Sequence, residues 1–194
     1  MKMRWFAGLI MICATFFIGS EVRAEDVPFG VYLESSLPFD GAASFTVGNG
    51  TSSETFHGYP RGFMYGFLFP VTEETAVDFA ISETTIRDLN FSSATTKKKN
   101  YSRRYSPEEV RFTSFEIGGR QYPTGVGMAL MYGMGEWRAV DQRTGEEETH
   151  NFETLGLKFG GNFTVTGDLF ALINVRIFFD PSIGILSTGL GYLF

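Results

Sequence analysis

Apolar side chains recur at every second position along most of this chain, and the positions between them carry mainly glycine, alanine and serine. A period of two is typical of a β-strand with one large apolar face and one face of small residues. After residue 24 no helical periodicity of comparable strength follows. The alternation predicts eight strands, within residues 29–37, 61–69, 76–82, 111–120, 126–134, 154–161, 170–179 and 186–194.

The segments between these strands alternate in length. Residues 70–75, 121–125 and 162–168 are short and rich in turn formers, whereas residues 38–59, 83–109 and 136–151 are long and polar, and only the last connection on that side, 180–182, is short. Short turns at one end and long loops at the other indicate an antiparallel up-and-down meander with both termini at the short-turn end.

The small-residue face carries a few charged residues, including Glu34, Glu116, Lys158 and Arg176. A soluble, lipocalin-like barrel points its apolar face inward around a ligand, and burying isolated charges against an apolar interior is costly. An outer-membrane barrel has the opposite arrangement, with its polar face in the lumen. We therefore expect an all-β, eight-stranded antiparallel up-and-down transmembrane β-barrel, with the soluble barrel as the alternative.

The N-terminal segment has the features of a cleaved secretory signal. Lys2 and Arg4 precede an apolar run from Trp5 to Ile18, and small residues follow near Ala24. We predict a cleaved signal peptide at 1–24 and an outer-membrane barrel at 25–194; the alternative is a retained anchor. The chain's one cysteine, Cys13, lies inside the apolar run, so the mature chain has no thiol chemistry.

The net charge of the chain bears on which classes of molecule it can bind. The formal net charge is −6, and it becomes two units more negative when the signal segment with its three basic residues and one acid is removed. An acidic domain argues against nucleic acid as a partner.

The last strand alternates up to the final residue, with Leu190, Tyr192 and Phe194 on its apolar face. In this respect the chain resembles the small outer-membrane β-barrel proteins of Gram-negative bacteria, the OmpA/OmpX type. The resemblance implies that these three residues form an assembly signal for the barrel-assembly machinery. It also implies a multi-pass protein of the cell outer membrane, with both termini in the periplasm and with outer-membrane lipids around it. The scaffold hosts unrelated functions, so activity does not follow from it.

The four inward charges are expected at similar heights in the barrel. Each residue of a tilted strand climbs about 2.5 Å, which places two acids and two bases in one layer. Side chains can fill the interior of an eight-stranded barrel. The interpretation is a lumenal ion-pair layer that plugs the barrel; the alternative is a narrow ion channel through the same residues.

The second long loop contains five basic residues: Lys97, Lys98, Lys99, Arg103 and Arg104. Lysine and arginine clusters attract phosphate, so this loop is a candidate contact for lipopolysaccharide or another anion. A solvated loop is the competing interpretation. The third loop is acidic, with Asp141, Glu146, Glu147 and Glu148, and exposed pairing between the two loops would be weak.

No pattern in the sequence favours an enzyme. The two histidines, His57 and His150, fall in or beside long loops, and His150 lacks the histidine-x-serine arrangement of barrel lipid A deacylases. Ser53, Ser102 and Ser106 would reach a histidine only if the loops folded together. Metal-ligand spacing and phosphate-binding glycine loops are also missing, so neither metal nor cofactor is expected.

The leading hypothesis is a non-enzymatic barrel with a side-chain-filled lumen. Its role would be structural, or would lie in surface interactions through long extracellular loops, with an unidentified extracellular or envelope protein as one class of partner. The alternatives are a lipid A- or phospholipid-modifying enzyme and a narrow ion channel.

Overall fold

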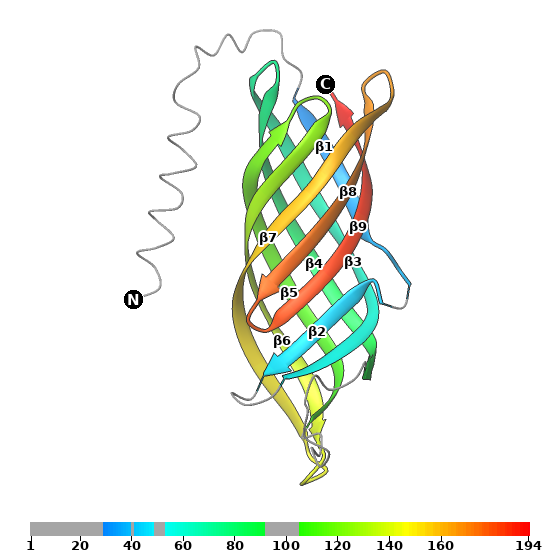
Figure 1. The fold of residues 1–194 in the computed structure, drawn as a ribbon, viewed down its shortest axis with the longest axis vertical. Helices are drawn as coiled ribbons and strands as arrows, with labels where there is room; N and C mark the ends of the chain where they lie inside the picture. The colour runs from blue at the N-terminus through cyan, green and yellow to red at the C-terminus, as the bar shows by residue number, and fades with distance from the viewer. Residues whose placement is uncertain (1–28, 40, 49–52, 92–104) are drawn as a thin grey trace, which may run out of the picture.

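The computed structural model describes residues 29–39, 41–48, 53–91 and 105–194. These residues form an all-β fold (Figure 1). Its strands are β1 (Gly30–Ser36), β2 (Ala43–Gly48), β3 (Ser53–Thr72), β4 (Thr75–Phe91), β5 (Tyr105–Gln121), β6 (Gly125–Asp141), β7 (Glu147–Thr166), β8 (Leu169–Phe179) and β9 (Ser182–Leu193). No helix among these residues is long and apolar enough to cross a membrane.

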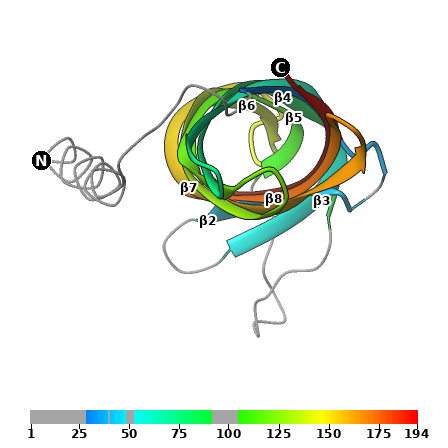
Figure 2. The same ribbon diagram turned by 90° about the horizontal axis from the view of Figure 1, so that it is seen from above.

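The strands close into a ring, seen end-on in Figure 2. From β3 to β9 each strand pairs antiparallel with the next, and β1 and β2 both lie between β3 and β9. The two short strands therefore share one position, and the ring has eight positions. The predicted fold class is confirmed.

The first position of the ring is interrupted, which the sequence analysis did not predict. Leu37 N–H donates to the Leu186 carbonyl (3.0 Å), and Leu186 N–H donates to the Ala42 carbonyl (3.1 Å). Leu186 of β9 thus bonds to both ends of the segment 37–42, which leaves the wall between β1 and β2. Gly41 has a φ of 84°, a backbone conformation that glycine adopts readily. The segment expected to be a loop after residue 37 instead returns to the wall as β2.

Three short turns mark one end of the barrel, which we call the turn end. They connect β3 to β4, β5 to β6 and β7 to β8 (Figure 1). The ring closes at this end, where Leu193 pairs with Gly30 and Phe194 N–H donates to the Phe29 carbonyl at 2.8 Å. The opposite end, which carries β2 and the β6–β7 hairpin, is called the loop end.

At the loop end the long loops predicted at 38–59, 83–109 and 136–151 are wrong in extent. The strands continue far into all three, and β6 and β7 are joined by residues 142–146 alone. The reason is that the inward positions stay apolar there, with Ile86, Val110 and Trp137 buried. The outward positions become polar there, and that change hides the alternation in the sequence.

The outward face carries an apolar belt around the turn-end part of the barrel. The predicted assignment of faces is confirmed, since the belt side chains are exposed while their neighbours in sequence point inward. They include Leu33, Phe63, Tyr65, Phe67, Phe79, Ile81, Phe115, Met128, Met134, Leu155, Phe159, Ile173, Val175 and Leu190. Towards the loop end the belt gives way to polar outward positions such as Glu83, Thr113, Glu136 and Glu153. A band of this kind is what a lipid bilayer solvates.

Candidate functional site

The lumen is filled by three layers of side chains, and β8 contributes to each. From the turn end, its buried inward residues are Phe170 and Leu172, then Asn174 and Arg176, then Phe178. The first pair belongs to a turn-end apolar layer, the second to a charged layer, and Phe178 to a loop-end apolar layer.

The charged layer contains all four predicted residues, brought together in one network. Arg176 Nη2 donates to Glu34 Oε2 at 2.6 Å, and Arg176 Nε donates to Glu116 Oε1 at 2.8 Å. Lys158 Nζ lies 2.9 Å from Glu116 Oε2, a close ion pair without good hydrogen-bond alignment. Arg176 and Lys158 are register partners on β8 and β7, so the two cations hold Glu116 between them.

Two further charged residues, Asp78 and Arg120, complete this layer and were missed by the sequence analysis. Asp78 Oδ2 accepts from Lys158 Nζ at 2.9 Å and from Arg120 Nη2 at 3.3 Å. Tyr32 donates its hydroxyl to Asp78 Oδ1 at 2.5 Å. Both residues have inward parity in strands whose faces were assigned correctly, so parity alone was a sufficient signal.

Amide and hydroxyl side chains connect the charges to one another. Asn174 Nδ2 donates to Glu34 Oε1 at 2.7 Å, and Asn174 Oδ1 accepts from Arg120 Nη2 at 3.1 Å. Ser187 Oγ donates to Glu34 Oε2 at 2.8 Å. The layer holds three acids and three bases with no net charge, and its charged side chains are almost fully buried. Buried charges are tolerated when they are paired and hydrogen-bonded in this way.

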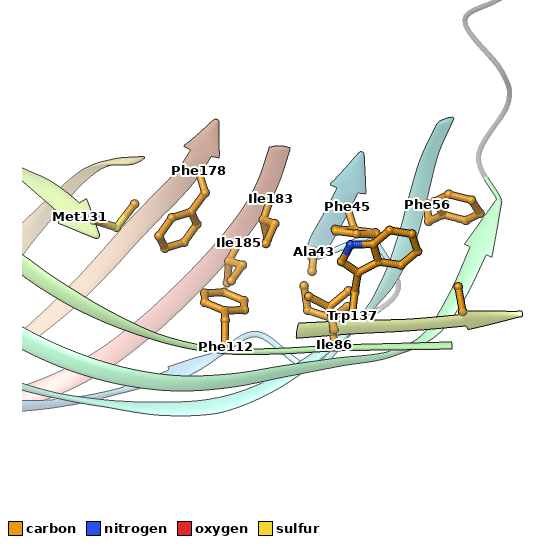
Figure 3. Close-up of a cluster of buried hydrophobic side chains, with 12 residues drawn as sticks. Ala43, Phe45, Phe56, Ile86, Phe112, Met131, Trp137, Phe178, Ile183 and Ile185 are labelled. Carbon is orange, nitrogen blue, oxygen red and sulfur yellow. The ribbon is translucent and has the colours of Figure 1, made fainter. Parts of the chain in front are cut away.

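On the loop-end side of the charged layer, a second apolar layer fills the lumen. Figure 3 shows its buried side chains. Phe112 and Phe178 meet edge to face with ring centroids 5.2 Å apart, and Phe45 lies 5.7 Å from Trp137. Aromatic pairs of this geometry add to the stabilisation that burial provides. β2 supplies Phe45, which is buried in this layer. Burial of this ring favours the return of the chain to the wall after residue 42.

The turn-end apolar layer closes the other side of the charged layer. Leu68, Phe170 and Leu172 are buried there. A Cβ atom at Gly66 would lie 1.9 Å from the Tyr32 ring, and one at Gly191 would lie 2.1 Å from the Phe170 ring. Glycine is required at both positions because a large side chain from a neighbouring strand occupies the space that a Cβ atom would fill.

On the outer wall at the loop end, three arginines surround one carboxylate. Glu109 accepts from Arg87 Nε at 2.7 Å, from Arg111 Nη2 at 3.2 Å, and from Arg138 Nη2. The Glu109 side chain is 6% exposed, and the arginine side chains are about half exposed. Burial alone would raise the pKa of Glu109, but hydrogen bonds from Arg138, Arg87 and Arg111 outweigh it and lower the pKa to about 2.

Known structures with the same fold are outer-membrane barrels. Ail, the attachment invasion locus protein of Yersinia pestis, has 15% identity, covers 87% of this chain and 99% of its own, and superposes with a TM-score of 0.59. A second structure, of Ail with the heparin analogue sucrose octasulfate, has 14% identity, covers 86% and 97%, and gives a TM-score of 0.54. The chain has the fold of a small outer-membrane β-barrel. No protein-family model matches the sequence, and no curated protein matches it either.

The histidines of this barrel do not form a catalytic arrangement within the described residues. His150 stacks on Trp137 with ring centroids 4.2 Å apart, and its Nε2 lies 3.1 Å from Glu148 Oε2. His57 faces Ser44 across the β2–β3 pair, a neighbour that the sequence analysis did not consider. However, His57 Nδ1 is buried and has no hydrogen-bond partner among the described residues, so none of these residues orients the ring through that nitrogen.

Several predicted features lie outside the described residues. They are the signal segment 1–24 and the basic cluster at Lys97, Lys98, Lys99, Arg103 and Arg104. In the described part of the chain, no group of three or more histidine or acidic side chains could hold a metal ion.

The residues of the predicted assembly signal, Leu190, Tyr192 and Phe194, all point outward in the belt. Phe194 stacks with Phe29 at 5.3 Å and meets Tyr192 edge to face at 5.0 Å. Phe194 therefore packs against Phe29, the residue that precedes β1.

Proposed function

We infer that this chain is a non-enzymatic barrel of the outer membrane, with a closed lumen and an extracellular sheet that serves as a contact surface. The observation that carries this conclusion is the filling of the lumen: a neutral, fully paired charged layer lies between two apolar layers. Ions crossing such a lumen would have to break buried ion pairs and pass two apolar layers, both of which are costly. The narrow-channel alternative is therefore disfavoured.

The contact surface is the part of the wall that projects beyond the β8–β9 turn. β7 pairs with β8 from Gly156 to Thr166, so Glu147–Glu153 of β7 extend roughly 20 Å past the end of β8. Along this stretch β6 is the strand partner that the described residues provide. An open strand edge invites pairing with an added strand of another protein. Ail, which has the same fold, is an attachment invasion locus protein, and this agrees with a surface role of this kind.

Lipids and the assembly machinery complete the proposed set of partners. The apolar belt fits outer-membrane lipids, and the basic segment 97–104 remains a candidate for lipopolysaccharide contact. Ail was solved with a sulfated heparin analogue, which agrees with an anionic partner for this fold. The outward row at Leu190, Tyr192 and Phe194 would be read by the assembly machinery while the last strand is still unpaired. The turn end, and both termini with it, would face the periplasm.

Two readouts on whole cells test this function. Cleavage of the signal removes Cys13, so single cysteines can be introduced at Thr144 in the β6–β7 turn and at Glu73 in the β3–β4 turn. We expect a membrane-impermeant maleimide to label Thr144→Cys on intact cells, and Glu73→Cys only after the outer membrane is permeabilised. Overexpression should leave the masses of lipid A and phospholipids unchanged. Labelling in the reverse order, or new lipid species dependent on the chain, would overturn the proposal.

A further inference from the structure

The outer wall of the barrel is hollowed where the apolar belt ends. The hollow has a volume of about 590 Å³ and spans β4 to β7. Its polar lining includes outward side chains in two cross-strand rows: Glu83, Thr113 and Glu153 nearer the belt, and Thr85, Arg111, Glu136 and Asn151 nearer the loop end. Gly135 lies among them, and a Cβ atom there would be 2.1 Å from the Arg111 carbonyl.

The two rims of this wall hollow differ in chemistry. On the turn-end side lie Met134, which lines the hollow, and the exposed belt side chains Phe115 and Leu155. On the loop-end side the next row pairs Arg87 with Glu109 and Glu109 with Arg138. A molecule in the hollow would therefore touch an apolar surface on its turn-end side and guanidinium groups on its loop-end side.

The guanidinium groups have capacity left for an anion. A single carboxylate, Glu109, accepts hydrogen bonds from Arg87, Arg111 and Arg138, and each guanidinium carries more N–H donors than these contacts use. The three arginine side chains are about half exposed, so their outer edges face solvent. Guanidinium groups bind phosphate with two parallel hydrogen bonds.

The carboxylates in the hollow disfavour the binding of a free inorganic anion such as phosphate. Glu83, Glu136 and Glu153 would repel a free phosphate, but they accept hydrogen bonds from sugar hydroxyls, as Asn151 and Thr113 also can. Phosphate acceptors and hydroxyl donors occur together in a phosphorylated sugar. The adjoining belt then requires that this sugar carry acyl chains.

We propose that the wall hollow binds the phosphorylated sugar headgroup of an outer-leaflet glycolipid. The phosphate would lie between Arg111 in the hollow and Arg138 on its loop-end rim, the hydroxyls on Glu136 and Glu153, and the acyl chains along the belt. This site is separate from the basic segment 97–104. It rests on the proposed outer-membrane placement, because only there does the rim of the belt meet glycolipid headgroups. The site would also fix the depth and rotation of the barrel in the leaflet.

The test uses the full mature chain in nanodiscs, with bound lipids counted by native mass spectrometry. The probes are lipid A carrying its phosphates, the same lipid A without phosphates, and phosphatidylglycerol, with inorganic phosphate as a soluble competitor. We expect preferential retention of phosphorylated lipid A and little competition by inorganic phosphate. Arg111→Gln should lower that retention roughly tenfold, since it removes a charge-assisted contact. Arg111→Lys, which keeps the charge but not the fork of donors, should give an intermediate loss.

Arg61→Gln is the matched control. Arg61 is exposed and pairs with Thr85, which pairs with Arg111, so it lies in the same row but outside the hollow. The Arg61→Gln variant should retain phosphorylated lipid A to within about twofold of the wild type, because the lost charge does not contact the bound lipid. Equal losses in the two glutamine variants, or equal retention of phosphatidylglycerol, would overturn the glycolipid site alone. A wild-type chain that fails to insert would overturn the membrane placement, and this site with it.

Discussion

Lys158 and Asp78 meet across the lumen, with Nζ 2.9 Å from Oδ2, although 80 residues separate them in the chain. Lys158 is also within 2.9 Å of Glu116, and Arg120 also reaches Asp78. The β4 and β7 walls are thus joined through the interior as well as through the ring of backbone hydrogen bonds. Because every charge in this layer has an opposite partner, the barrel contains a polar core that is electrically neutral.

The first prediction concerns that core. Arg176→Met should destabilise the folded barrel by about 3–5 kcal/mol, because Glu34 loses its paired cation and Glu116 loses one of two. The double variant Glu34→Gln/Arg176→Met should lose less than the sum of the two single changes, since it removes both members of a pair. Urea unfolding in detergent micelles measures all three values. Strictly additive losses would mean that the two residues are not coupled.

The second prediction concerns the apolar belt. Arginine in place of Ile173, an exposed belt residue, should cost about 2–4 kcal/mol in a bilayer because the charge enters the hydrocarbon region. The same change at Thr144, in the exposed β6–β7 turn, should cost little. Equilibrium unfolding from lipid vesicles compares the two. Equal costs would show that the belt does not face lipid.

The third prediction concerns the loop-end apolar layer. Phe178 is fully buried and packs on Phe112, so Phe178→Ala should cost about 3–5 kcal/mol through lost burial and the cavity that remains. Phe179, the next residue, points outward and is 57% exposed, and Phe179→Ala is therefore the matched control. A loss at Phe179 as large as the one at Phe178 would contradict the assignment of the two faces in this strand.

The fourth prediction concerns pH. The pKa of folded Glu109 is lowered to about 2 from an ordinary value of 4.5, so its contribution to stability is complete above pH 4.5 and is lost as the pH falls towards 2. The difference in unfolding free energy between wild type and Glu109→Gln should accordingly shrink across that window. Comparing the two proteins cancels the titration of the lumenal acids. A difference that stayed constant down to pH 2 would rule out the lowered pKa.

The sequence predicted the structure well inside the apolar belt, where the outward side chains are apolar and many inward ones are small or polar. Inside the belt, alternation identified the strands, their faces and the inward Glu34, Glu116, Lys158 and Arg176. Asp78 and Arg120 stood on the same inward face but were not counted among the lumenal charges. Their pairing with Lys158 and with Asn174 could not be derived from parity, because it depends on side-chain reach across the ring.

Beyond the belt the sequence was less informative. Both faces of β3 to β7 carry polar residues there, so the inward Phe56, Ile86 and Trp137 appeared isolated within polar segments rather than as one layer. The break between β1 and β2 was also hidden. It depends on Leu186 of β9 meeting both Leu37 and Ala42, a relationship between the two ends of the chain that no local pattern contains.

The assembly signal gives a fifth prediction. Deleting Phe194 removes the ring that stacks on Phe29 and shortens the outward row of the last strand. We expect slower insertion into the outer membrane and an accumulation of unfolded chain in the periplasm, followed by pulse-chase labelling and gel migration with and without heating. Phe194→Tyr keeps an aromatic ring and serves as the control. Wild-type insertion rates for the deletion would show that this residue is not part of the signal.

Single-channel recording in planar bilayers tests most directly whether the three layers of side chains close the lumen. The wild-type barrel should show little steady conductance, because the charged layer is fully paired and lies between two apolar layers. Arg176→Ala, which opens space and leaves Glu34 without its cation, should give brief openings. A large and stable conductance from the wild-type protein would contradict the closed lumen and would favour the channel instead.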